Sequence, residues 1–397
     1  MGYDVVIGLD VGKSMHHAVA LDPQGRRLVD GEVANAEPAL RELFGRAAGE
    51  GEVLLVVDQL HSIGALPVTV ARAMGIDVAY LPGLSMRRLA DLHPGSAKTD
   101  ARDAYVIANA ALTAPHALRT LGVPDQTRAD LAMLLGYDDD LVAQTTAANN
   151  RLRALLSQVH PSLEKALGGN ISHPAVLHLL VRAGGPTGLR KMGRTRIDSQ
   201  LRKHAPRIHE SLTERIWVGL AEQTVVVPGT AAAERVIPGL AAQLLQLRDE
   251  RERIARDVEE VLDAHPLAEV LTSMPGVGVK IAARLLAEIG GDVSGFATAA
   301  HLAAYAGLAP ITSRSGSSIR SERVNHGGNK RLKNAMFIAA FASLRADPAS
   351  RAYYDRKRAE GKRHTAALIC LARRKTDVLF AMIRDHKTYV PAMPSAA

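Results

Sequence analysis

The order of apolar segments near the N-terminus constrains the fold of this 397-residue chain more than any other feature. Three strand-like segments come first, and helices and strands then alternate. We expect strands at residues 5–9, 17–21, 27–33, 53–58 and 77–82, and helices at 38–48, near 64–74 and from 99 onward. That order predicts an α/β RNase H-like domain with a mixed central sheet.

The stretch "VVIGLDVGKS" at residues 5–14 partly matches a phosphate-binding loop. Such a loop needs four residues between its first glycine and Gly-Lys-Ser, and it leads into a helix. Here only three residues separate Gly8 from Gly12, and the next segment reads as a strand. The residue of interest is therefore Asp10. It either caps a turn at the strand end or meets a cation, because a lone carboxylate among apolar side chains is costly.

Three further aspartates could join Asp10 in one site. Asp58 ends the next buried strand. Asp100 and Asp103 lie on one face of a helix that Thr99 can cap. Each has an ordinary alternative: Asp58 could cap the following helix, and the helical pair could be solvated residues favoured by the helix dipole. Together the four carboxylates predict a site for two Mg²⁺ or Mn²⁺ ions that supports phosphoryl transfer.

Charge is distributed unevenly along the chain. Residues 1–150 hold 12 Lys/Arg against 19 Asp/Glu, residues 151–265 hold 17 against 13, and residues 266–397 hold 20 against 9. The net charges of −7, +4 and +11 favour acidic metal ligands in the first part and phosphate contacts in the last. A single cysteine excludes a disulfide framework, and neither a leader nor a long apolar run is evident, so we expect a cytoplasmic protein.

Residues 126–265 read as helical, with one loop-like break near "RAGGPTGLRKMGRTR" (182–196). Between 237 and 261, apolar residues recur at alternating spacings of three and four, interrupted by Arg251. Such a narrow stripe with charged flanks favours a coiled coil, either between subunits or as a hairpin. The alternative is an amphipathic helix that packs within its own chain.

The last part opens with "LTSMPGVGVKIAARLLAEIG" (271–290). A short helix, a Pro-Gly-Val-Gly turn and a second helix predict a helix-hairpin-helix in a mainly α domain. Gly276 and Gly278 would let backbone N–H groups approach a phosphate, and Lys280 would add positive charge. A plain turn between two helices is the alternative.

A serine-rich basic segment, "GLAPITSRSGSSIRSERVNHGGNKRLKNAMF" (307–337), is the second chemical centre. A serine with a lowered pKa could attack a phosphate, and the surrounding cations would stabilise the anionic transition state. Alternatively its hydroxyls only donate hydrogen bonds to phosphates, since no base is identifiable. The cations that we expect to contact nucleic acid, here and elsewhere, are Lys13, Lys280, Arg314, Arg320, Arg323, Lys330, Arg331 and Lys333.

In their order along the chain, these motifs resemble those of the DEDD-type transposases of bacterial insertion sequences. The segments "GLDVGKSMHHAVAL", "VVDQ", "KTDARDA", "PGVGVKIAARLLAEIG" and "AGLAP…SG…NHGGNKRLKNA" cover nearly the whole chain. The resemblance implies a RuvC-like domain (1–125), a helical linker with a coiled coil (126–265) and a serine-bearing C-terminal transposase domain (266–397). It also implies a nucleoid-associated recombinase that cuts and rejoins donor and target DNA, guided by a bridge RNA.

The resemblance implies roles for single residues as well. The family's acidic quartet, in which the second acid is usually glutamate, falls here on Asp10, Asp58, Asp100 and Asp103. The family's nucleophilic serine precedes a glycine, which matches Ser315, with Ser313 and Ser317 as neighbouring alternatives. Because serine and carboxylates lie in different domains, we expect a homo-oligomer, joined by the coiled coil, in which one subunit's serine reaches another's carboxylates.

Three other functions stay open. A metal-dependent nuclease such as a junction resolvase would use the carboxylates alone, with the serine segment only binding DNA. A non-catalytic nucleic-acid-binding protein would keep the aspartates for structural reasons. An actin-like ATPase is more distant, because "GLDVGKS" resembles only the first of that fold's phosphate loops.

Overall fold

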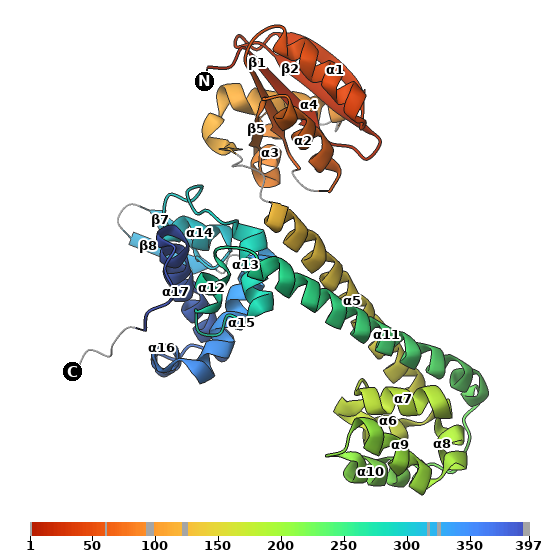
Figure 1. The fold of residues 1–397 in the computed structure, drawn as a ribbon. Helices are drawn as coiled ribbons and strands as arrows, with labels where there is room; N and C mark the ends of the chain where they lie inside the picture. The colour runs from red at the N-terminus through yellow and green to blue at the C-terminus, as the bar shows by residue number, and fades with distance from the viewer. Residues whose placement is uncertain are drawn as a thin grey trace, which may run out of the picture. The chain divides into compact units, whose positions relative to one another are not determined.

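The computed structural model describes residues 2–59, 62–92, 99–120, 126–315, 318–323 and 327–391, with the backbone alone given for the strands within 311–323. The chain divides into two compact units, Met1–Pro124 and Asp125–Ala397 (Figure 1). Among the described helices, none combines the length and the apolar character of a membrane span.

The first unit is built on a sheet with strand order β3-β2-β1-β4-β5-β6. The strands are β1 (Val5–Asp10), β2 (Met15–Leu21), β3 (Arg27–Ala34), β4 (Val53–Val57), β5 (Asp77–Tyr80) and β6 (Arg119–Thr120). β1 is antiparallel to β2 and parallel to β4, so the sheet is mixed. This order confirms the predicted RNase H-like arrangement, and every expected strand is present. The two-residue β6 at the sheet edge was not predicted.

Helices cover both faces of this sheet. The helices are α1 (Glu37–Ala48), α2 (Ala65–Ala73), α3 (Gly83–Ala90), which was not predicted, and α4 (Asp100–Thr113). Alternation along β1 places Val5, Ile7 and Leu9 in one core with side chains of α1 and α2. Val6, on the opposite face, packs in a second core with side chains of α4. The face covered by α4 is the one that carries the candidate site.

Two long antiparallel helices organise the second unit, α5 (Gln126–Val159) and α11 (Thr230–Asp263) (Figure 1). The segment 161–221 between them, here called the helical module, contains α6 (Pro161–Leu167), α7 (Pro174–Ala183), α8 (Pro186–Met192), α9 (Arg194–His204) and α10 (His209–Ala221). The loop-like break predicted at 182–196 is therefore wrong, since α8 and α9 cover most of it. Only glycines interrupt the helices, and Gly184 adopts a φ of 82°.

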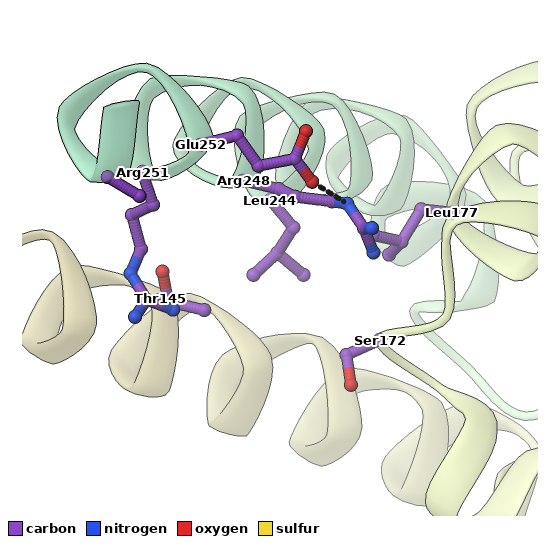
Figure 2. A pocket seen from close by; sticks show the side chains of 8 residues that line it. Thr145, Ser172, Leu177, Leu244, Arg248, Arg251 and Glu252 are labelled. Atoms are coloured by element: carbon purple, nitrogen blue, oxygen red, sulfur yellow. Dashed lines mark hydrogen bonds and ion pairs between the residues drawn. The ribbon is translucent and has the colours of Figure 1, made fainter. Parts of the chain in front are cut away.

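The apolar stripe of α11 packs within its own chain. Its apolar residues are buried, except for the last, which is half-buried: Ile237, Leu240, Leu244, Leu247, Ile254, Val258 and Val261. Arg251, which interrupts the stripe, donates from Nε to Oδ1 of Asp138 in α5 at 3.0 Å. Figure 2 shows Arg251 and Leu244 of α11 facing α5 across a cavity of about 420 Å³. Because α5 and the module cover this stripe, the structure does not support the expectation that it joins subunits.

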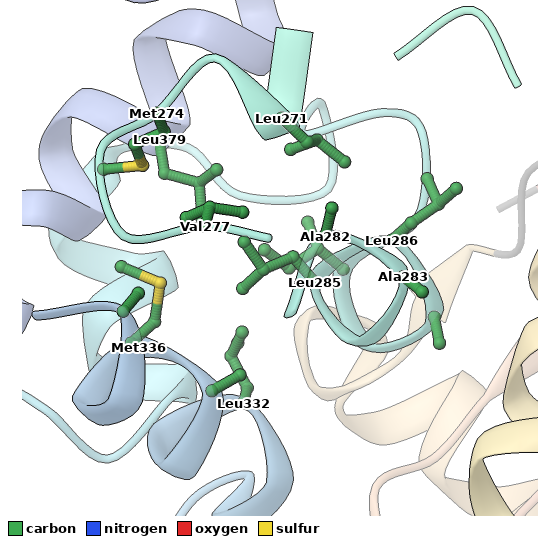
Figure 3. Packing of buried hydrophobic residues seen from close by; sticks show 14 of the residues in the cluster. Leu271, Met274, Val277, Ala282, Ala283, Leu285, Leu286, Leu332, Met336 and Leu379 are labelled. Carbon is green, nitrogen blue, oxygen red and sulfur yellow. The ribbon is translucent and has the colours of Figure 1, made fainter. Parts of the chain in front are cut away.

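The rest of the second unit is mainly helical. It contains α12 (Ala268–Thr272), α13 (Val279–Ile289), α14 (Ala299–Tyr305), β7 (Ile311–Ser315), β8 (Ser318–Arg323), α15 (Lys330–Ala346), α16 (Pro348–Ala359) and α17 (His364–Asp385). Figure 3 shows its core, in which Val277 and Leu285 meet Leu332 and Met336 of α15. The same core includes Leu135 of α5, so residues on both sides of position 265 pack together. The domain boundary expected there stays a prediction.

Candidate active site

Two carboxylates lie at the carboxyl ends of neighbouring parallel strands. Asp10 ends β1, and Asp58 directly follows β4. The register pairs Leu9 with Val57, so Asp10 and Asp58 are the next residues of the two strands. Both residues are half-buried. Since neighbouring strands run about 4.8 Å apart, this register brings the backbones of two predicted site residues side by side at one edge of the sheet.

Helix α4 packs on the face of β1 to which Asp10 belongs. Gly8 lies two residues earlier on that face, and a Cβ at Gly8 would be only 2.3 Å from the carbonyl oxygen of Ala104. The absence of a side chain at Gly8 therefore allows the helix to approach the strand closely. Asp103 directly precedes Ala104 in this helix.

The first turn of α4 carries the other two predicted carboxylates. Thr99 is its N-cap, and its side chain accepts a hydrogen bond from the backbone N–H of Arg102 at 3.3 Å. Asp100 is exposed and Asp103 is half-buried. A carboxylate in the first turn of a helix is stabilised by the positive end of the helix dipole. The positions of Asp100 and Asp103 therefore also have the ordinary explanation that the sequence left open.

The segment after Asp10 is a tight turn that leads into the antiparallel strand β2, in place of the helix that would follow a phosphate-binding loop. A Cβ at Gly12 would lie 2.0 Å from the carbonyl oxygen of Met15. The N–H of Gly12 donates to Nδ1 of His16 at 3.2 Å. Burial lowers the pKa of His16, which favours the neutral imidazole that can accept this bond. No sequence pattern identified His16 as a residue of the site. Its only signal is its position shortly after the turn that contains Gly12.

The serine-rich segment forms a β-hairpin in the second unit. β7 and β8 are antiparallel, and Ser315 pairs with Ser318 at the end of the ladder. Ser313 pairs with Ser321 farther from the tip. Ser317 lies outside the described residues, as do the side chains of Arg314, Arg320 and Arg323. The expected loop is therefore a two-stranded hairpin, with Ser315 as the last residue of β7.

Two glycines hold the base of this hairpin. A Cβ at Gly307 would lie 2.4 Å from the carbonyl oxygen of Gly327, and one at Gly328 would lie 2.7 Å from the N atom of Gly307. Beside them, Asn329 caps α15 through a hydrogen bond from the N–H of Leu332 to its Oδ1 at 3.0 Å. The "GL" before the hairpin and the "GGN" after it thus meet in the fold.

Comparison with known proteins assigns the family. A model of DEDD-type transposases matches residues 7–161, and a model described as the transposase IS116/IS110/IS902 family matches residues 268–355. The 43.6 kDa protein of insertion element IS110 from Streptomyces coelicolor is 54% identical over 392 residues, which cover 98% of this chain and 96% of that protein.

The chain belongs to the IS110/IS116 family of transposases. This transposase is also 37% identical over 400 residues to the 42 kDa protein of insertion element IS900 from Mycobacterium paratuberculosis, with full coverage of both. A pilin gene-inverting protein of Moraxella bovis is 36% identical over 124 residues, or 31% of this chain and 38% of that protein. Family membership makes this protein an enzyme of DNA recombination, and the segment that matches the DEDD-type model takes in most of the first unit and α5.

The carboxylates of this transposase suit a divalent metal in their chemistry. Aspartate oxygens are the hard ligands that Mg²⁺ and Mn²⁺ prefer. Asp10 and Asp58 share one sheet edge, and α4 packs on the same face. Within the described ranges, however, no group of three or more His, Cys, Asp or Glu side chains is close enough to hold an ion. The donor set fits a metal, but a closed coordination shell is not formed.

Several residues predicted to contact phosphates have partners within this transposase. Nζ of Lys280 donates to Oδ2 of Asp138. Nε of Arg331 lies 3.4 Å from Oδ2 of Asp139. A Cβ at Gly276 would lie 2.2 Å from the carbonyl oxygen of Ala339, so that glycine allows α15 to come close. A helix-hairpin-helix that binds DNA stays a prediction.

The remaining predicted contact residues face solvent to differing degrees. Gly278, the N-cap of α13, is exposed and has open space around its Cα. Lys13 and Lys330 are exposed, and Lys333 is half-buried. Their positions allow phosphate contacts without demonstrating them.

Proposed function

We propose that this transposase cuts and rejoins the donor and target DNA of an insertion sequence through its acidic quartet and Ser315. The observation that carries the proposal is the register of β1 and β4, which sets Asp10 beside Asp58 on the face where α4 packs against Gly8. No ordinary packing requirement calls for two adjacent carboxylates at the end of two buried strands.

Under this proposal Asp10, Asp58, Asp100 and Asp103 hold Mg²⁺ or Mn²⁺, with two ions as the expected number. When bound, such ions activate the attacking oxygen and stabilise the leaving oxygen in phosphoryl transfer. The chain positions its own ligands, since Thr99 begins α4 at a defined residue and Gly8 sets the helix close to the strand. Asp58 is one methylene shorter than the family's usual glutamate, which alters its reach but not its charge.

Ser315 is the proposed nucleophile, with Ser313 and Ser317 as alternatives. Its Oγ forms an ester bond to the DNA phosphorus, the bond from phosphorus to the leaving deoxyribose oxygen breaks, and the serine proton is lost while the leaving oxygen gains one. The number of phosphoester bonds is unchanged. A hydroxyl of another strand can therefore reverse the step and rejoin DNA without ATP.

The proposed partners are donor and target DNA, a bridge RNA that selects the sites, and further copies of this chain. The net charge of +11 over residues 266–397 supports nucleic-acid contacts in the last part of the chain. Since α5 covers the stripe of α11, subunits would meet through other surfaces. The chemistry would still require Ser315 to reach a set of carboxylates, either those of another subunit or those of its own chain.

The test is a search for covalent protein–DNA chemistry. Full-length protein, Mg²⁺, the RNA that co-purifies with it and end-labelled DNA carrying the joined element ends are incubated and run on a denaturing gel. Ser315→Ala and Asp10→Asn are compared with wild type, and Ser318→Ala serves as the matched control because Ser318 pairs directly with Ser315.

A labelled adduct that persists in Ser318→Ala and disappears in the other two variants supports the proposal. Cleavage without an adduct that survives Ser315→Ala overturns the serine mechanism and leaves a metal-dependent nuclease. An adduct lost only in Ser313→Ala would move the nucleophile to Ser313.

A further inference from the structure

The helical module lies between the two segments that match transposase family models, which end at residue 161 and resume at residue 268. The family match therefore assigns it no role. Residues 161–221 hold 10 Lys/Arg against 4 Asp/Glu, a net charge of +6. This excess, on a segment inserted between two long helices, calls for a physical explanation.

A cavity of about 480 Å³ opens between α7, α8 and α9 of this module. Each helix contributes one exposed cation to its wall: Arg182 from α7, Lys191 from α8 and Arg196 from α9. Ser199 and Gln200 add a hydroxyl and an amide. Among the described residues that line it, none is acidic. We call this cavity the basic pocket.

Among the described residues, no carboxylate pairs with the cations of the basic pocket, unlike two other arginines of the module. Elsewhere in the module, Arg202 pairs with Asp198 at 3.0 Å, and Arg194 pairs with Glu214. No ion pair within the described ranges involves Arg182, Lys191 or Arg196. Three like charges around one hollow repel one another, and an anion that enters it relieves that repulsion.

The cavity between α5 and α11 shows the contrasting arrangement. It also contains two arginines, but Arg248 pairs with Glu252 at 3.0 Å (Figure 2), and Arg251 pairs with Asp138 of α5. Its charges are therefore neutralised inside the chain. The basic pocket differs from this cavity because its three cations are left for an external anion.

We infer that the basic pocket binds the phosphodiester backbone of the DNA on which this transposase acts. Cations from three directions, a hydroxyl and an amide are the donors that proteins use for phosphate and sugar oxygens. A volume of about 480 Å³ admits a phosphate together with its sugar. The inference rests on the proposed function only in naming DNA as the occupant.

The test measures DNA affinity of the full-length protein against salt concentration. A fluorescently labelled random-sequence DNA duplex is titrated in EDTA, so that no metal-dependent cleavage occurs. The variant is Arg182→Gln/Lys191→Gln/Arg196→Gln. The matched control, Arg202→Gln/Lys203→Gln/Arg207→Gln, removes three exposed cations of the same module that do not line the pocket.

We expect the pocket variant to reduce the slope of log affinity against log salt by about 1, because the pocket admits one phosphate and each phosphate contact contributes about 0.9. The control should change the slope much less. Equal losses in both variants, or none in the pocket variant, overturn the inference. A loss confined to binding of a labelled RNA hairpin also overturns it, since the occupant would then be RNA.

Two further measurements distinguish binding by the basic pocket from a structural role of its arginines and from the proposed chemistry. Arg182→Lys/Arg196→Lys keeps the charge and should keep the affinity; if it does not, the arginines serve the fold and the inference fails. The adduct assay of Ser315→Ala and Asp10→Asn tests the proposed chemistry in Mg²⁺, and the titration in EDTA tests the basic pocket alone. Failure of the proposed chemistry and failure of the basic pocket are thus observed in different experiments.

Discussion

Nε of Arg251 lies 3.0 Å from Oδ1 of Asp138, and the other carboxylate oxygen of Asp138 accepts from Lys280. Asp138 is only 4% exposed. One carboxylate thus joins three helices: α5, which carries it, α11 and α13. It also accounts for the arginine that interrupts the apolar stripe of α11, because that arginine faces an acid on the partner helix.

Replacing this carboxylate should destabilise the second unit. Asp138→Ala is expected to lower the free energy of unfolding by about 1–3 kcal/mol, because two cations lose their buried partner. Asp140→Ala, two positions away and exposed, should stay within about 0.5 kcal/mol of wild type. Urea unfolding of the full chain measures both. Equal effects of the two variants would contradict the role of Asp138.

The stabilisation by Asp138 should decrease at acidic pH. Burial alone would raise the pKa of Asp138, but the hydrogen bonds from Lys280 and Arg251 outweigh it and hold the pKa below its ordinary value of 3.8. A lowered pKa means that this stabilisation is present above 3.8 and is lost as the pH falls through the folded-state pKa. The stability difference between wild type and Asp138→Ala should therefore shrink below about pH 4. A difference that stays constant down to pH 2 would exclude this linkage.

Gly8 should tolerate no side chain. Gly8→Ala places a Cβ 2.3 Å from the carbonyl oxygen of Ala104, so α4 must move away from β1. We expect a loss of about 1–3 kcal/mol in stability, as in other overpacked cores, together with a loss of DNA cleavage. Gly31→Ala in β3, where a Cβ meets nothing within 4 Å, is the control for glycine replacement in a strand of the same sheet. Thermal unfolding and cleavage rates would test both, and normal cleavage by Gly8→Ala would show that the position of α4 does not matter.

Lys375 should make stability depend on alkaline pH. It is 4% exposed in α17, and burial lowers its pKa from 10.5 to about 8, although Asp347 acts in the opposite direction. The unfolded chain then binds more protons than the folded chain between about pH 8 and 10.5, so this residue's contribution to stability rises with pH in that window. Lys375→Met should be more stable than wild type at pH 7 by about 1–3 kcal/mol, and the gain should fall toward pH 10. Lys387→Met, at an exposed position, serves as the control; a gain independent of pH would count against ionisation as the cause.

Asp58 offers a test of metal binding that does not depend on catalysis alone. Asp58→Glu keeps the charge and should keep Mn²⁺ binding and cleavage. Asp58→Asn removes the charge and should weaken Mn²⁺ binding, with cleavage slower on the order of 100-fold or more. Mn²⁺ binding is measured by electron paramagnetic resonance of the free ion. Unchanged Mn²⁺ binding in Asp58→Asn would remove this residue from the proposed ligand set.

Asn329 should stabilise the base of the serine hairpin through two sets of hydrogen bonds, which different substitutions can remove separately. Its Oδ1 caps α15, and its Nδ2 donates to Oε2 of Glu288 at 2.7 Å and to Oη of Tyr305 at 3.1 Å. Asn329→Ala should cost about 2 kcal/mol, and Asn329→Ser, which can keep the cap, about 1 kcal/mol. Chemical unfolding would detect the difference. Equal losses would mean that the cap contributes nothing.

Local patterns were enough to predict much of the first unit. Short apolar segments mark its strands, and Thr99 marks the start of α4, because such runs and helix caps depend on residues close in sequence. Asp10 and Asp58 could be placed at one edge because both end buried strands of a parallel pair. The short α3 and the two-residue β6 escaped prediction, since neither has a clear periodicity of its own.

Contacts between residues far apart in the chain were decided only by the tertiary structure. Lys280 and Arg331 read as phosphate contacts, yet their neighbours in space are Asp138 and Asp139 of α5. Gly276 reads as a phosphate-binding glycine, yet α15 packs against it. The stripe of α11 was correctly recognised as apolar, but its period could not say whether another subunit or α5 would cover it.

The sequence by itself determined the succession of β1 to β5 along the first unit, the start of α4 at Thr99 and the four aspartates with their spacing, because each depends on interactions within a few residues. The tertiary structure decided which cations are neutralised inside the chain and which surround an open pocket. The physical reason is that an ion pair such as Lys280–Asp138 joins residues 142 positions apart. Its partners are chosen by how whole helices pack, which no local pattern of residues records.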